Sequence, residues 1–269
     1  MRVAVWDILP AELFPHGTEE SAITFVRLPL GGCRRALSEG SAEVTLLPVI
    51  DILQDPDPYD VLPAVAFSSW SFPFAKIVLK RGLGSHLKML AYPREHDQAA
   101  FVARVILREH YHSEPQWIAV DEKSPESLVA RAEDACLVIG PGVPAFEPGA
   151  TALDLGQEWY ELSNYPMVWG LFAARRGDAT VGVIRAIRDA VVRVDDARPS
   201  RAKALVEGMK AFVQDELRLR LDDLATASLT ELTNYAYFYG LTEDPGMIPF
   251  VSLPDEAEEN GSPADLPSW

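Results

Sequence analysis

Two short stretches of the chain carry side chains that could hold an anion. The first is FSSWSFPFAKIVLKR, residues 67–81, in which the hydroxyl groups of Ser69 and Ser71 precede Lys76 at the head of an apolar strand pattern. A lysine at a strand end beside a hydroxyl-rich loop can pair with a carboxylate. The alternative is a solvent-facing lysine, because Lys76 shares one face of the strand with Lys80.

The second stretch is YPREHDQAAF, residues 92–101, where a helical pattern begins. Arg94, His96 and Gln98 surround this start. Backbone N–H groups at a helix N-terminus, together with side-chain donors, make a ready anion site. The alternative is that Asp97 simply caps the helix. Taken together, the two stretches indicate a site for a small-molecule carboxylate.

The candidate nucleotide- and metal-binding motifs of this sequence lack the local structure that such sites need. VIGPGVPA, residues 138–145, fits the G-x-G-x-x-A pattern, but Pro144 and Pro148 prevent the helix that would present its N-terminus to a pyrophosphate. His110 and His112 stand two apart near a helix end and so point to different faces. No Walker A, H-E-x-x-H or C-x-x-C motif occurs. We expect a strand-end turn at 138–145, no cofactor and no metal.

Composition excludes further classes of protein. A formal net charge of −16 repels nucleic acid, so we expect no nucleic-acid partner. Apolar runs end before the roughly 18 residues that a membrane span needs, and the N-terminus lacks a signal-peptide layout. Cys33 and Cys136 have no metal-like spacing and are expected to be buried thiols. The expectation is a cytoplasmic protein with no membrane partner, whose oligomeric state the sequence leaves open.

Periodicity indicates an α/β fold. Strand and helix patterns alternate over residues 2–53, which favours a mainly parallel sheet covered by helices. Three more strands are expected after the proline-rich connection QDPDPYDVLP (54–63), and helix and strand patterns then alternate again. Two long helices are expected in residues 178–222, separated near Pro199, and a third in residues 228–241.

This organisation predicts two lobes. Residues 1–91 and 167–253 are expected to form a large α/β lobe with C-terminal helices, and residues 92–166 a small inserted α/β lobe. The acidic segment 254–269, rich in proline and small polar residues, is expected to be a disordered tail. Ligands favour clefts between such lobes.

Four segments of the chain resemble one family, in that family's order. LDLGQEWYELSNYPMVWGLFAARR (153–176) resembles the block LDLGeeWxexTGLPFVFAvW of the chorismate dehydratases of the futalosine route to menaquinone. LSEGSAEVTLLPVIDIL (37–53) is similar to that family's L.sGelDvaLvPsieyl, and AEDACLVIG (132–140) to its adAaLlIGd. LTNYAYFYGLTED (232–244) is similar to its closing yl...i.Y.L.ee.

The resemblance implies a fold and an activity. The family's fold is similar to that of the two-lobed periplasmic-binding proteins of type II, with a ligand cleft between the lobes. Its activity is that of a carbon–oxygen lyase, which removes water from chorismate to give 3-[(1-carboxyvinyl)oxy]benzoate. The residues then expected to bind the substrate are Ser69, Ser71, Lys76, His96, Gln98 and Gly140.

The chain departs from the family at positions that contact the ligand. Leu9 stands where the family has an asparagine implicated in the chemistry, and Lys76 where a family serine contacts a substrate carboxylate. The family's helix start SrTS is HDQA here (96–99), and Pro141 replaces an aspartate. No catalytic residue is assigned from the sequence. The alternative function is a non-catalytic binding protein for a small anionic or aromatic metabolite. The sister enzyme that processes cyclic futalosine shares the fold but has no distinctive support in this sequence.

Overall fold

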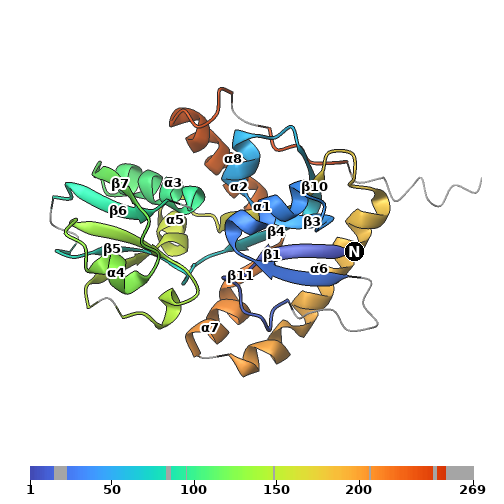
Figure 1. The fold of residues 1–269 in the computed structure, drawn as a ribbon, viewed down its shortest axis with the longest axis horizontal. Coiled ribbons are helices and arrows are strands. Elements are labelled where there is room, and N and C mark those ends of the chain that lie inside the picture. Colours follow the sequence, from blue (N-terminus) through green and yellow to red (C-terminus); the bar gives the residue numbers. More distant parts are fainter. Residues whose placement is uncertain are drawn as a thin grey trace, which may run out of the picture.

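Two β-sheets with helices packed on them form the two lobes of the protein (Figure 1). The structure is a computed structural model and describes residues 1–14, 23–82, 86–94, 96–147, 149–205, 207–244 and 247–252. The acidic segment 254–269, expected to be a disordered tail, lies outside the described residues. Among the residues that are described, no helix is long and apolar enough to cross a membrane.

The first lobe is built on a six-stranded sheet in the order β11-β4-β10-β3-β1-β2. β1 pairs in parallel with β2 and β3, whereas β10 runs antiparallel between β3 and β4, and β11 antiparallel to β4. The expected parallel arrangement therefore holds for only half of the sheet, because β10 enters from the other lobe against the direction of its neighbours. The strands are β1 (Arg2–Trp6), β2 (Thr24–Leu28), β3 (Val44–Pro48), β4 (Tyr59–Ser69), β10 (Met167–Arg175) and β11 (Leu217–Arg220).

The helices of the first lobe are mostly short. They are α1 (Leu30–Ser38), α2 (Val49–Gln54), α6 (Val181–Arg201), α7 (Glu207–Ala211) and α8 (Asp223–Phe238). α6 continues through Pro199, where the sequence predicts a break. The second long helix expected before residue 222 is instead a series of short helical segments, α7 among them, followed by β11. In β11, Leu217 and Leu219 are buried while Arg220 is exposed. This two-residue alternation fits a strand at the edge of a sheet better than a helix.

The second lobe is built on a five-stranded sheet in the order β7-β6-β8-β5-β9. β6 is parallel to β7 and β8, and β5 is antiparallel to β8 and β9. The Ser124 side chain caps α4 by accepting from Ser127 N–H, as the Ser-Pro pair predicts. The elements are β5 (Ala75–Leu79), β6 (Met89–Pro93), α3 (Asp97–Val105) with a following π-helical turn (Ile106–His110), β7 (Gln116–Val120), α4 (Pro125–Val129), β8 (Ala135–Ile139), β9 (Thr151–Asp154) and α5 (Leu155–Ser163).

The two sheets divide the chain at a different point from the expected lobe boundary. The sequence places residues up to 91 in the large lobe, yet β5 and β6 both pair within the second sheet. β5 follows β4 after a short loop and has the same apolar pattern, so only its pairing with β8 and β9 reveals the lobe to which it belongs. The chain therefore crosses between the lobes at residues 70–74 and returns at 164–166.

The first crossing is fixed against the start of α5. Phe72 N–H donates to Asp154 Oδ1 at 2.6 Å, and the same oxygen caps α5 by accepting from Gly156 N–H at 2.9 Å. A Cβ on Gly156 would lie 2.6 Å from the carbonyl carbon of Ser71. Only glycine permits this close approach of helix and crossing segment. The LDLG sequence is thus part of the junction between the lobes.

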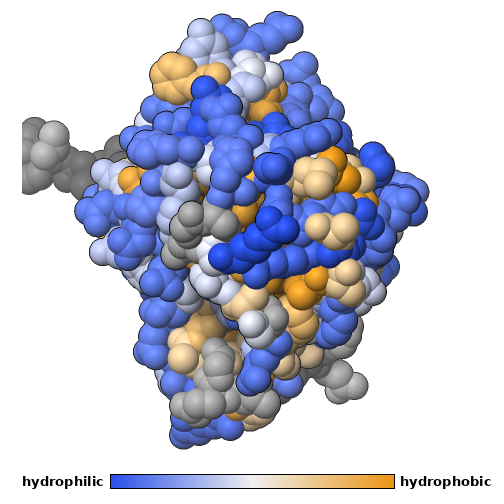
Figure 2. All heavy atoms as spheres, turned by 90° about the vertical axis from the view of Figure 1, so that its left-hand side faces the viewer, coloured by the Kyte–Doolittle hydropathy of each residue, from blue (hydrophilic) through white to orange (hydrophobic). Residues whose placement is uncertain are grey.

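α8 belongs to the first lobe and packs on the second, as its place beside the boundary in Figure 1 shows. Trp159 Nε1 donates to Ser228 Oγ at 3.1 Å, and the Trp159 ring meets Tyr235 edge-on with centroids 5.9 Å apart. The hydroxyl of Tyr239, just after α8, donates to Glu109 Oε1 at 2.8 Å. Figure 2, which faces the second-lobe end, shows a mainly hydrophilic surface with smaller hydrophobic areas between.

Candidate functional site

A cleft of about 300 Å³ lies between the two lobes. It is bordered by the segments that follow β1, β2 and β3 in the first lobe, and by those that follow β7 and β8 in the second. The N-termini of α1 and α3 also reach it. Ligands in α/β proteins bind at the carboxyl ends of parallel strands, and here such ends from two sheets face one another. Most of the side chains that line it are apolar, among them Trp6, Ile8, Leu30, Phe72, Ile139 and Trp169.

Three aromatic rings among these wall residues are held in place by the surrounding structure. The rings of Phe72 and Trp169 are stacked, with centroids 4.1 Å apart and planes at 20°. Trp6 Nε1 donates to Leu46 O at 2.8 Å. A Cβ on Gly170 would lie 2.7 Å from the Trp6 ring, so this glycine makes room for it. Fixed aromatic walls suit a flat, unsaturated ligand.

Three of the expected site residues do not line the cleft. Ser69 is fully buried on β4, and its hydroxyl accepts from Trp169 Nε1 at 2.9 Å, so it supports a wall residue instead. Ser71 lies in the first crossing, where its backbone contacts Glu216. Lys76 lies within β5, half-buried, opposite Asp154 of β9. Their positions follow from strand pairings that the sequence does not reveal.

The other three, His96, Gln98 and Gly140, line the cleft together with Pro141. His96 is the N-cap residue of α3, and its carbonyl accepts from Ala100 N–H at 3.0 Å. Gly140 has a φ of 140°, which favours glycine, and begins the turn after β8. The strand-end turn expected at 138–145 is therefore present, and it leads into a short 3₁₀ helix at Val143–Ala145.

Gln98 is 5% exposed, and protein groups already bind both ends of its amide. Its Nε2 donates to Trp169 O at 2.6 Å and lies 3.4 Å from Val168 O, while its Oε1 accepts from Ile50 N–H at 3.1 Å. Gln98 therefore ties α3 of the second lobe to α2 and β10 of the first. It shapes the cleft and has few donors left for a ligand.

Asp7 and Lys123 line the cleft although the sequence did not single them out. The backbone of Asp7 is fixed on both sides, because its N–H donates to Leu28 O at 2.9 Å and its carbonyl accepts from Arg27 Nη2 at 2.5 Å. The signal that could have identified Asp7 is its place directly after a buried strand, where functional side chains of α/β proteins gather. By contrast Leu9, two residues on, is buried in the core and lies outside the lining.

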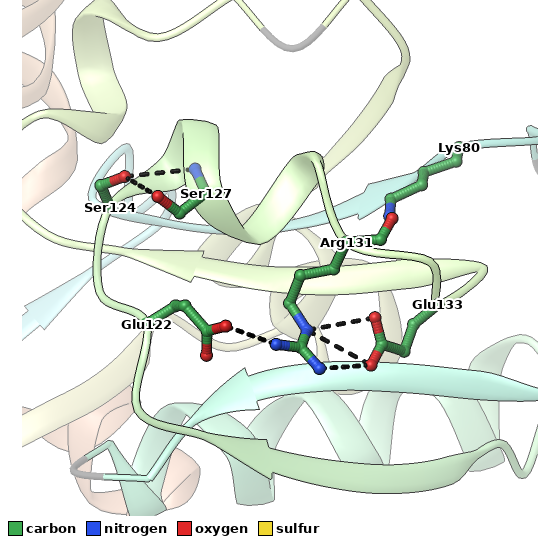
Figure 3. Close-up of polar contacts among 6 residues, drawn as sticks. All are labelled: Lys80, Glu122, Ser124, Ser127, Arg131 and Glu133. Carbon is green, nitrogen blue, oxygen red and sulfur yellow. Dashed lines mark hydrogen bonds and ion pairs between the residues drawn. The ribbon is translucent and has the colours of Figure 1, made fainter.

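The loop that carries Lys123 is held by a cluster of charges shown in Figure 3. Arg131 binds Glu122, the neighbour of Lys123, at 2.5 Å and Glu133 at 2.8 Å. Lys80 Nζ donates to Arg131 O at 2.5 Å. Hydrogen bonds from Arg131 lower the pKa of Glu133. The cluster fixes the approach of this loop to the cleft.

Burial shifts the pKa of two titratable groups, Cys33 and Asp154. Burial raises the pKa of Cys33 on α1 to about 12, so its thiol stays protonated at neutral pH. Within the described ranges, no group of three or more histidine, cysteine or acidic side chains is arranged to hold a metal ion. Burial also raises the pKa of Asp154, against the opposing effect of its backbone hydrogen bonds and of Lys76.

Comparison with solved structures identifies the fold. The chain is similar to the Archaeoglobus fulgidus protein AF1704, with a TM-score of 0.64 and 22% identity, over 89% of this chain and 97% of that one. It is also similar to the alkanesulfonate-binding protein SsuA from Xanthomonas axonopodis pv. citri, solved with MOPS bound, with a TM-score of 0.64, 14% identity and coverage of 93% and 97%. A third is CA3427 of Candida albicans, described as having the generic periplasmic binding protein fold, with a TM-score of 0.61, 10% identity and 91% of each chain. The two-lobed periplasmic-binding-protein fold expected from the sequence is confirmed.

Sequence comparison gives the family. A search of curated protein sequences finds no significant match. A family model described as menaquinone biosynthesis matches residues 1–238, which is most of the chain. The chain therefore belongs to the menaquinone biosynthesis family.

Proposed function

We propose that the protein binds chorismate in the inter-lobe cleft and removes water from it, giving 3-[(1-carboxyvinyl)oxy]benzoate. The observation that carries this proposal is the cleft itself, with aromatic walls and polar groups at its rim, in a chain of the menaquinone biosynthesis family. Its volume lies at the lower end of the range for ligand pockets, about 300–1,000 Å³, which suits a single-ring metabolite. The four sequence segments that resemble chorismate dehydratases support the same substrate.

The cleft offers complementary groups for each part of this substrate. The ring fits against Trp6 and the Phe72–Trp169 stack. The two carboxylates are assigned to Lys123 and His96 of the second lobe and to backbone N–H groups at the start of α1. Donors from both lobes thus engage one ligand and favour closure around it.

The reaction breaks one C–H bond and the neighbouring C–O bond, releases water and completes an aromatic ring, with no change in overall oxidation state. The gain in aromatic stability reduces the demand on the protein, which has to orient the substrate and accept one proton. Among the described residues that line the cleft, Asp7 carries the only carboxylate. We assign proton acceptance to Asp7, since a carboxylate in a cleft for a dianion is otherwise unfavourable.

The test is incubation of the purified protein with chorismate and separation of the products by chromatography. The expected result is 3-[(1-carboxyvinyl)oxy]benzoate, formed at a rate proportional to protein concentration. Lys123→Ala is expected to raise KM, while Lys88→Ala serves as the matched control, because Lys88 is exposed just before β6 and does not line the cleft. Unchanged chorismate at high protein concentration would rule out the proposal.

A second candidate is binding without chemistry, and two observations favour it. Leu9 is buried where the family has its asparagine, and the amide of Gln98 is occupied by protein groups. Under this reading the cleft closes on a small anionic or aromatic metabolite and releases it unchanged. Stabilisation of the protein by chorismate or benzoate in a thermal-shift assay, without turnover, would support it. Absence of any shift across mono- and dicarboxylates would count against it.

A further inference from the structure

A second depression lies on the first lobe, outside the inter-lobe cleft. It has a volume of about 640 Å³ and is formed by α1, the connection into β4 and the end of β10. Its lining includes four arginines, Arg34, Arg35, Arg175 and Arg176. The whole chain has 24 lysines and arginines against 40 acidic residues, whereas the lining of this depression has four arginines against one acidic residue, Asp55. We call this feature the arginine groove.

The four arginines differ in how far the protein already uses them. Arg176 is structural, because its guanidinium binds the carbonyls of Asp57 and Pro56 and the carboxylate of Asp60. Arg34 forms one ion pair with Asp55 at 3.5 Å, and both side chains are about half exposed. Arg176 thus anchors one side of the groove, whereas the other three arginines can still bind a further partner.

Arg35 and Arg175 have the most guanidinium N–H groups available for a ligand, and they lie on different elements. Arg35, on α1, is exposed and forms no ion pair within the described part of the chain. Arg175, at the end of β10, pairs through Nε with Asp178 at 2.8 Å, and its terminal nitrogens make no hydrogen bond to any described residue. Gly40, with a φ of 73°, leaves space for Arg175, since a Cβ there would lie 2.7 Å from Nη1. The backbone therefore accommodates this guanidinium over the end of α1.

We propose that the arginine groove binds a small anion that carries two linked phosphate groups. Planar guanidinium groups match phosphate oxygens with paired hydrogen bonds, and two arginines from separate elements match two such groups. The net charge of −16 repels anions from the rest of the surface, so affinity has to come from this local set of donors. The groove shares only Gly31 with the lining of the inter-lobe cleft, so this ligand is separate from the substrate of the proposed reaction.

The test is isothermal titration calorimetry of the full chain with inorganic pyrophosphate. The expected result is saturable binding at one site per chain, at least tenfold weaker in the double variant Arg35→Ala/Arg175→Ala. Arg35→Ala alone, at an exposed position, is expected to give an intermediate loss and guards against misfolding of the double variant. Arg81→Ala is the matched control, since Arg81 is 73% exposed on the second lobe and pairs with Asp134 at 3.6 Å.

Several results would overturn the proposal. These are the absence of saturable binding to the wild type, unchanged binding in Arg35→Ala and the double variant, or an equal loss in Arg81→Ala, which would indicate attraction by overall charge. Malonate that binds as tightly as pyrophosphate would overturn the assignment to phosphate. Chorismate turnover is measured in parallel, and because the groove lies outside the cleft, failure of either proposal leaves the other standing.

Discussion

Replacing Gln98 tests whether its amide holds the lobes together. Gln98 Oε1 satisfies Ile50 N–H in the first turn of α2, a position with no partner inside the helix. Its Nε2 satisfies Trp169 O, which lies at the irregularity between Val168 and Gly170 where the β10–β4 register shifts. Each buried group left without a partner costs about 1–3 kcal/mol. Gln98→Met keeps the volume and loses both bonds, so we expect it to lower the free energy of unfolding by about 2–6 kcal/mol.

The measurement is urea unfolding followed by tryptophan fluorescence, with the slope compared between variants to check that unfolding remains two-state. The matched control is Gln157→Met, because Gln157 is exposed on α5 and its replacement should change stability by less than about 0.5 kcal/mol. If Gln98→Met were as stable as the control variant, the amide would contribute no net stabilisation. The inferred tie between the lobes would then be wrong.

Three further predictions concern the junction and the cleft. Gly156→Ala places a Cβ against the Ser71 backbone and should destabilise the fold by about 1–3 kcal/mol in thermal unfolding. Gly182→Ala at the start of α6, where the Cβ would meet Thr180 Oγ1 at an unstrained 3.8 Å, should be neutral or stabilising. Burial raises the pKa of Asp154 in the folded protein. The Asp154 carboxyl group therefore loses its proton at lower pH in the unfolded chain than in the folded protein. The free energy of unfolding of the wild type falls as pH rises between these two pKa values. The stability advantage of the wild type over Asp154→Asn should therefore shrink as pH rises from about 4, and a difference independent of pH would contradict this assignment. Asp7→Asn should lower kcat for chorismate about 100-fold with little change in KM, and equal activity would leave the substrate's own carboxylate as the proton acceptor.

Much of the fold could be predicted because local pattern and family resemblance agree. LDLGQEWYELSNYPMVWGLFAARR predicts a helix followed by a strand that returns the chain to the first lobe, and α5 and β10 match this description. Two of the expectations that failed depend on distant pairing. β11 is a strand because the edge of β4 is available to it, and β5 belongs to the second lobe because β8 and β9 flank it.

The cleft was harder to predict than the fold. His96 and Gln98 were expected near the ligand from the helix start in 92–101 and Gly140 from the resemblance, and all three line the cleft. The use of the Gln98 amide could not be foreseen, because its partners in β10 lie about 70 residues away in sequence. The same limit applies to Lys76. Alternation along β5 does not show which side of the sheet faces solvent, because that depends on the position of the neighbouring strands.

The contacts of α8 with the second lobe have a consequence for synthesis of the protein on the ribosome. Trp159 finds its hydrogen-bond partner in Ser228, 69 residues later, and Glu109 finds Tyr239, 130 residues later. A nascent chain that has emerged only through β10 has all the strands of the second sheet but lacks α8, which packs against Trp159 of α5. Completion of the second lobe therefore waits for nearly the whole chain, and pairings of such long sequence separation slow folding. Truncation before α8 is expected to leave the surface around Trp159 exposed and the chain prone to aggregation.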